Sequence, residues 1–139
     1  MGLDVAVFKS VSTMEREFPF HRFQRDPVTG ECEAIHPGGV NLGWDDVTAC
    51  QWRVGNILHV AALRETIAGS LGEGSALEQL VLFSGSHAGD VINDPSFDEI
   101  ARELRLIRSS TDAWVREFID GLSELMRIAR REKNPIVFV

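Results

Sequence analysis

Segment 84–94 gathers residue types that can hydrolyse a substrate or bind a metal. Within it, His87, Asp90 and Asp94 could coordinate a divalent cation, and serines lie next to the histidine. The order of residues does not match the nucleophile elbow G-x-S-x-G, because His87 stands where the motif needs serine. The spacing also differs from that of an EF-hand. A small hydrolase or metal-dependent enzyme using this loop is therefore an alternative, whereas the leading expectation is no catalytic residue, no metal and no cofactor.

Trp44, Asp45 and Asp46 form the second chemically informative group. An aromatic side chain beside carboxylates is typical of a binding hot spot for a basic partner. The competing interpretation is a tryptophan packed into its own loop. Loops that carry large aromatic residues usually do one or the other.

The remaining motifs exclude several functions. The glycine-rich segments 37–39 and 69–74 match neither a P-loop nor G-x-G-x-x-G, so neither phosphate-binding motif is present. Four histidines are widely separated and lack metal-binding spacing. The two cysteines, Cys32 and Cys50, form no disulfide framework, and free thiols in a reducing cytosol are expected.

Charge is distributed unevenly along the chain. The 139 residues carry a formal net charge of −7, which disfavours nucleic acid as a partner. Segments 26–52 and 65–101 contain no Lys or Arg, whereas most basic residues lie between 102 and 133. An acidic face would accelerate association with a basic protein. The simpler interpretation is that the acids keep the protein soluble.

Hydrophobic patterning predicts one α+β domain spanning residues 1–139. The expected sheet is mixed and has about five strands, with three helices packed mainly on one face. Turn residues 26–30 predict a hairpin between segments 18–24 and 31–35. The expected elements are strands at 3–9, 80–83 and 136–139, and helices at 53–71, from about 94, and at 112–133. Segment 36–52 is predicted to be largely irregular.

The N-terminal residues lack the basic and apolar regions of a signal peptide, and no apolar run approaches the length of a membrane span. These features predict a cytoplasmic protein that contacts no membrane.

Several short motifs resemble those of an immunity-protein family of bacterial toxin systems. They are Gly2-Leu3 with Val7-Phe8, segment 80–90, Glu103-Leu104, and Pro135-Ile136-Val137-Phe138. Together they cover about half of the chain. The resemblance implies a small cytoplasmic protein that binds and neutralises a cognate toxin, expected to be basic. The expected partner contacts are Trp44, Asp45, Asp46, His87, Asp90, Asp94 and Asp98. A homodimeric domain of unknown role is a further alternative.

Overall fold

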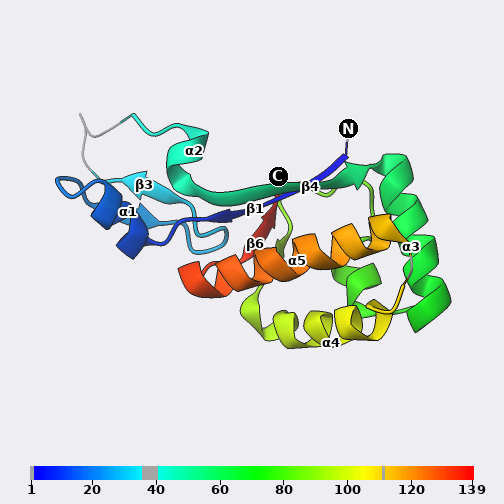
Figure 1. Ribbon diagram of the computed structural model, residues 1–139. Helices are drawn as coiled ribbons and strands as arrows, with labels where there is room; N and C mark the ends of the chain where they lie inside the picture. The colour runs from blue at the N-terminus through cyan, green and yellow to red at the C-terminus, as the bar shows by residue number, and fades with distance from the viewer. Residues whose placement is uncertain (1, 36–40, 111) are drawn as a thin grey trace.

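The centre of the molecule is a four-stranded antiparallel sheet with the order β4-β1-β6-β5 (Figure 1). A computed structural model describes residues 2–35, 41–110 and 112–139. The strands are β1 (Gly2–Phe8), β4 (Thr48–Asn56), β5 (Val91–Ile92) and β6 (Ile136–Phe138). The N-terminal strand and the strand formed by residues 136–138 are therefore both internal to the sheet.

The side chains of β1 alternate between the two faces of the sheet, and each face packs against a different hydrophobic cluster. Leu3, Val5 and Val7 join the main hydrophobic core, whereas Phe8 belongs to a second, smaller cluster. Successive strand residues point to opposite faces, so the apolar run is buried on both sides.

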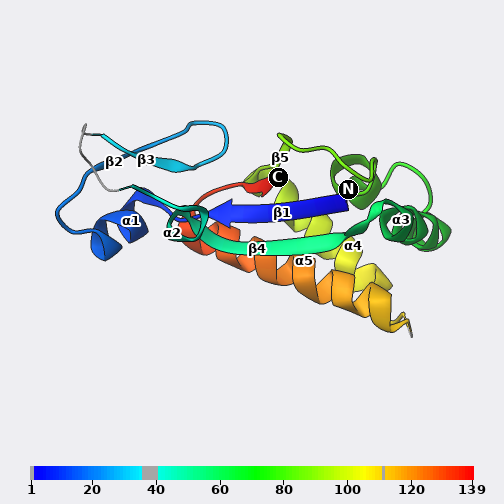
Figure 2. The ribbon, with the colours of Figure 1, turned by 90° about the horizontal axis from the view of Figure 1, so that it is seen from above.

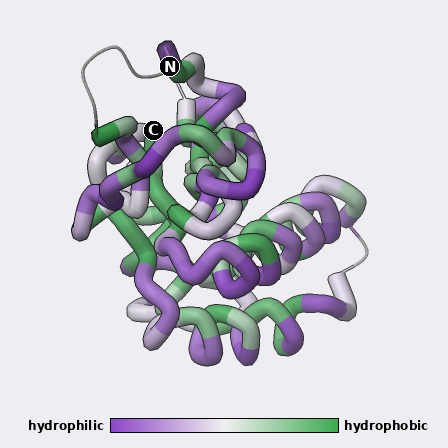
Figure 3. The backbone as a smooth tube through the Cα atoms, turned by 90° about the vertical axis from the view of Figure 1, so that its left-hand side faces the viewer, coloured by the Kyte–Doolittle hydropathy of each residue, from purple (hydrophilic) through white to green (hydrophobic). Residues whose placement is uncertain are grey.

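Three longer helices form a second layer on one face of the sheet. They are α3 (Ile57–Leu71), α4 (Phe97–Ile107) and α5 (Ala113–Glu132). Helix α5 lies under β1 and β4, and α4 packs against α5 and α3 on the side away from the sheet (Figures 1 and 2). Hydrophobic and hydrophilic residues alternate along α4 and α5 (Figure 3). Their apolar stripes, which include Ile100, Leu104, Phe118 and Leu122, supply much of the core.

One end of the molecule consists of a β-hairpin and a short helix. Strands β2 (Phe23–Arg25) and β3 (Cys32–Ala34) pair with each other, and α1 (Val11–Glu17) packs near β2. Gly30 closes the hairpin turn with φ +81°, a conformation that L side chains rarely adopt. A Cβ at this position would also collide with Asn134, so both the turn and its packing require glycine.

Several predictions are confirmed by these elements. The strands at 3–9 and 136–139, the hairpin with its 26–30 turn, and the helices beginning near residues 94 and 112 are all present. Asp112 is the N-cap of α5, and Lys133 ends that helix in a left-handed conformation. The α+β class is therefore correct.

The sheet prediction was wrong in detail. Instead of a mixed sheet of about five strands, the described residues form an antiparallel sheet of four strands and a separate pair. Residues 48–56, expected as loop and helix, are strand β4, and α3 begins only after its N-cap Asn56. The expected helix count also omitted α1 and α2 (Trp44–Val47).

The predicted strand at 80–83 was also wrong. Residues Leu77–Val81 form a π-helical turn, η1, and Leu82 follows it as a buried residue. A short apolar run is buried in either conformation, so hydrophobicity alone could not distinguish them. Between η1 and α4, a 3-10 turn, η2 (Asp94–Ser96), precedes the longer helix.

Candidate functional site

Helix α2, which begins at Trp44, lies over the sheet face opposite α5 (Figure 1). The Trp44 indole N–H donates to Gln51 Oε1 at 2.7 Å, and its ring meets Phe8 edge-on at 5.5 Å between centroids. Even so, 42% of Trp44 remains exposed. The side chain is therefore held in position while part of its aromatic surface is exposed to solvent.

The two acids after Trp44 have different environments. Asp45 is exposed, whereas Asp46 is half-buried and its Oδ2 accepts the Gly43 N–H at 2.8 Å. Asp46 thus stabilises the first turn of α2, and Asp45 offers the freer carboxylate. We call Trp44, Asp45, Asp46 and Gln51 the Trp44 surface.

Loop 84–90 holds His87 in a largely enclosed position. The His87 ring lies between Phe83 and Phe138, at centroid distances of 4.1 and 3.9 Å. Its Nε2 is 2.9 Å from the Val81 carbonyl oxygen, and its Nδ1 is 3.1 Å from Asp90 Oδ2. Only 5% of the side chain is exposed, which leaves little surface for a substrate or partner.

Each ring nitrogen of His87 therefore lies within hydrogen-bond distance of a protein oxygen. The neighbouring Ser84 hydroxyl donates to the Ser86 carbonyl oxygen rather than to the histidine. A serine nucleophile would need a hydrogen bond to its general base, and none links these groups. Across the residues that the structure describes, no group of three or more His, Cys, Asp or Glu side chains could hold a metal ion.

The acids near η2 are exposed but paired. Arg130 donates to Asp94 at 3.1 Å and to Asp98 at 2.8 Å, which links α5 to the start of α4. The side chains of Asp94 and Asp98 are 73% and 90% exposed. The single positive charge of Arg130 offsets only part of the two negative charges, so this pair of acids attracts a basic partner less than two isolated carboxylates would.

The sequence-predicted contacts thus fall into two separate groups. Trp44, Asp45 and Asp46 lie by β4 on the face opposite α5, whereas His87, Asp90, Asp94 and Asp98 lie near the β5 edge and α4 (Figure 1). The acidic candidates from the two base-free stretches therefore lie on different elements of the fold.

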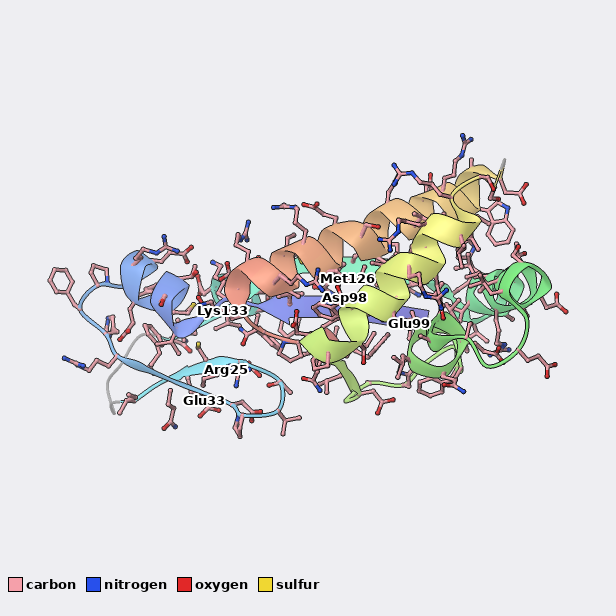
Figure 4. All side chains as sticks on the ribbon, turned by 90° about the horizontal axis from the view of Figure 1, so that it is seen from below. Arg25, Glu33, Asp98, Glu99, Met126 and Lys133 are labelled. Carbon is pink, nitrogen blue, oxygen red and sulfur yellow. The ribbon has the colours of Figure 1, made fainter. Side chains whose placement is uncertain are left out.

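A groove that sequence reasoning missed lies where α1, β2 and the end of α5 meet. It has a volume of about 680 Å³ and is lined by four basic side chains, Arg16, Arg25, Arg131 and Lys133. Figure 4 shows Arg25 on the hairpin beside Lys133 at the end of α5. These residues are far apart in the sequence, and no motif connects them, so only the tertiary structure reveals the cluster.

Two buried polar side chains hold the walls of this groove together. Glu132 Oε1 accepts the Ser10 N–H at 3.0 Å and the Thr13 hydroxyl at 2.7 Å, which fixes α1. Asn134 donates to the Phe8 carbonyl oxygen at 2.8 Å and accepts from Arg25 Nε at 2.8 Å, which fixes the hairpin. Both are only 5% exposed, so the frame is rigid and desolvated.

The Glu132 carboxylate should make stability depend on pH. Burial alone raises the pKa of Glu132, but hydrogen bonds from Ser10, Thr13 and Arg131 outweigh burial and hold the pKa below its ordinary value. The charged form therefore favours folding above the unfolded-state pKa of about 4.3, and this contribution disappears as pH falls through the folded-state pKa. Thermal unfolding of wild type and Glu132→Gln between pH 7 and pH 3 measures it.

We expect Glu132→Gln to cost about 1–3 kcal/mol at pH 7, and the stability difference between the two proteins to shrink as the pH falls through the folded-state pKa of Glu132. Other carboxylates titrate in both proteins, so the difference isolates Glu132. An equal difference between the two proteins at pH 7 and pH 3 would contradict this role.

The fold and side chains define an α+β protein with a helical layer on one face of an antiparallel sheet. No family model, curated protein or solved structure matches the chain. Among the helices in the described ranges, none combines the length and apolar character required to cross a bilayer.

Proposed function

We propose that this chain is an immunity-type protein that binds a cognate, basic bacterial toxin in a one-to-one complex. The observation that carries the proposal is Trp44, which is held by Gln51 and Phe8 yet is 42% exposed beside an exposed Asp45. Tryptophan is enriched among binding hot spots, and a fixed side chain loses little conformational entropy on binding.

Electrostatics supports the same kind of partner. Asp45 and Asp46 lie in a segment without Lys or Arg, within a chain of net charge −7. Carboxylates at the border of an interface mainly raise the association rate with a basic protein. The short motifs that resemble those of an immunity-protein family agree with this proposal, in which the protein binds its partner stoichiometrically and catalyses no reaction.

The test uses the protein encoded directly upstream of this gene as the candidate toxin. Binding is measured by calorimetry, and protection is measured by co-expression in cells that the toxin kills. We expect a one-to-one complex. Trp44→Ala should weaken it at least 30-fold, corresponding to about 2 kcal/mol. Asp45→Ala should slow association several-fold at low salt, with a smaller effect at high salt.

Matched controls separate the Trp44 surface from general effects. Phe20→Ala removes another exposed aromatic side chain, and Asp120→Ala removes another exposed carboxylate, both away from α2. Neither control should change affinity appreciably. Absence of both binding and protection would reject the immunity role. Unchanged binding by Trp44→Ala would reject the Trp44 surface as the contact.

A further inference from the structure

The basic groove differs from the rest of the protein in how its charges are balanced. Four cationic side chains and only one carboxylate, Glu132, line it, although the whole chain carries a charge of −7. The carboxylate is buried, pairs with Arg131 at 3.0 Å and accepts two further hydrogen bonds. Its charge is already compensated, so the groove has an excess of positive charge.

Three of these cations form no salt bridge with the acids that the structure describes. No carboxylate of the described residues lies within 4.0 Å of the charged nitrogens of Arg16, Arg25 or Lys133. By contrast, Arg102, Arg127 and Arg130 on α4 and α5 each pair with an acid. The positive charges of these three groove side chains are therefore available to bind an anion, whereas arginines elsewhere on the protein are engaged in salt bridges.

The arginines are also oriented by polar contacts that leave most of their donors unused. Arg25 uses Nε to bond Asn134, and Arg16 uses Nη2 to bond the Thr13 hydroxyl at 3.2 Å. A guanidinium has five N–H donors in a planar fork, which matches the oxygens of a phosphate. Holding Nε in place pre-organises the remaining donors for an anion.

Lys133 occupies its place at a conformational cost. Its φ of 55° makes it the one non-glycine residue with positive φ in the described chain. A helix commonly ends at such a position with glycine, which adopts it without strain. The lysine side chain contributes charge to the groove from a backbone position that glycine would fit better.

The size of the groove indicates the kind of anion. Its volume of about 680 Å³ falls within the range of small-molecule sites, roughly 300–1,000 Å³. A second groove of about 420 Å³ adjoins it through Arg25, Lys133 and Asn134. Several cations in a space this large suit an extended polyanion better than a single carboxylate.

We propose that this groove binds a small molecule carrying two or more adjacent phosphate groups, as in a nucleoside diphosphate or inorganic pyrophosphate. The P-loop and the dinucleotide fingerprint are absent from the sequence, and this site relies instead on side-chain cations brought together by the fold. The proposal is independent of the Trp44 surface, which lies on α2 and β4.

Isothermal titration calorimetry of the full chain with pyrophosphate and with ADP tests the proposal. We expect one site with a dissociation constant below about 1 mM, corresponding to more than about 4 kcal/mol, that weakens as salt is raised. Tenfold tighter binding of ADP would show that the nucleoside contributes, and equal affinity would show that the phosphate chain suffices. Both results support the site.

Variants distinguish a built site from general attraction. Arg16→Ala and Lys133→Gly should each weaken binding about tenfold, because each removes one cation. Lys133→Gly should also unfold at or above the wild-type temperature, since glycine relieves the positive φ. Lost binding therefore cannot be attributed to lost folding.

The control Arg105→Ala removes an exposed arginine on α4 outside the groove and should leave affinity unchanged. The proposal is overturned if neither ligand binds at concentrations up to about 5 mM, well above the expected dissociation constant. It is equally overturned if Arg105→Ala weakens binding as much as Arg16→Ala does.

Discussion

Removal of residues 137–139 is expected to abolish the cooperative unfolding transition. Strand β6 lies between β1 and β5, so its loss leaves β5 without a neighbouring strand and leaves β1 paired only with β4. Val137 and Phe138 are 4% and 1% exposed, and the His87 ring packs on Phe138. Loss of a buried phenylalanine alone costs about 3–5 kcal/mol, and the strand pairing adds to it.

That total approaches the roughly 5–15 kcal/mol that stabilises a typical domain. The measurement is thermal and urea unfolding followed by circular dichroism and tryptophan fluorescence. The truncated chain should show no sharp transition and should bind a hydrophobic dye.

Two point variants serve as controls within the same segment. Phe138→Ala should remain folded but lose several kcal/mol, whereas Val139→Ala should change stability by less than about 1 kcal/mol because Val139 is 38% exposed. A truncated protein with a full cooperative transition would show that β6 is dispensable.

Replacement of Glu103 by alanine is expected to cause the next largest loss. Glu103 on α4 is 4% exposed, and its two carboxylate oxygens accept the backbone N–H groups of Ala76 and Leu77, each at 2.8 Å. These donors begin η1 and would remain unsatisfied in the variant. The expected cost is roughly 3 kcal/mol, because unpaired buried donors lose their full hydration.

Glu103→Gln keeps the size and shape of the side chain and tests whether stability requires two acceptor oxygens at this position. The amide oxygen can accept one N–H, but its NH₂ group would face the other, so we expect an intermediate loss of about 1–2 kcal/mol. The control is Glu99→Ala on the same helix, which removes an exposed pair with Arg102 and should cost less than about 1 kcal/mol. Urea unfolding of all three variants gives the free energies. Equal losses for Glu99→Ala and Glu103→Ala would contradict the capping role.

Glu103 also explains why the strand predicted at 80–83 was wrong. Nothing in residues 75–83 reveals that a carboxylate twenty-six residues later satisfies the first backbone donors of η1. The apolar run fits a strand or a helical turn equally well. The long-range cap favours the helical choice, and it exists only after α4 has packed.

The strand β4 was missed for a related reason. Its residues alternate weakly, and bulges interrupt its pairing with β1 near both ends. Pairing with β1 supplies the hydrogen bonds that the local sequence does not predict. By contrast, α5 was predicted closely because its apolar stripe, its cap Asp112 and its basic last turn are all local signals.

The sequence by itself determined the α+β class, the amphipathic helices, the hairpin turn and the Trp44-Asp45-Asp46 cluster. These depend on periodicity, capping and turn chemistry, which act over a few residues. The tertiary structure alone decided that the acidic candidates lie in two groups and that His87 is enclosed. It also brought Arg16, Arg25, Arg131 and Lys133 into one groove, because contacts made by Glu132 and Asn134 join segments more than a hundred residues apart.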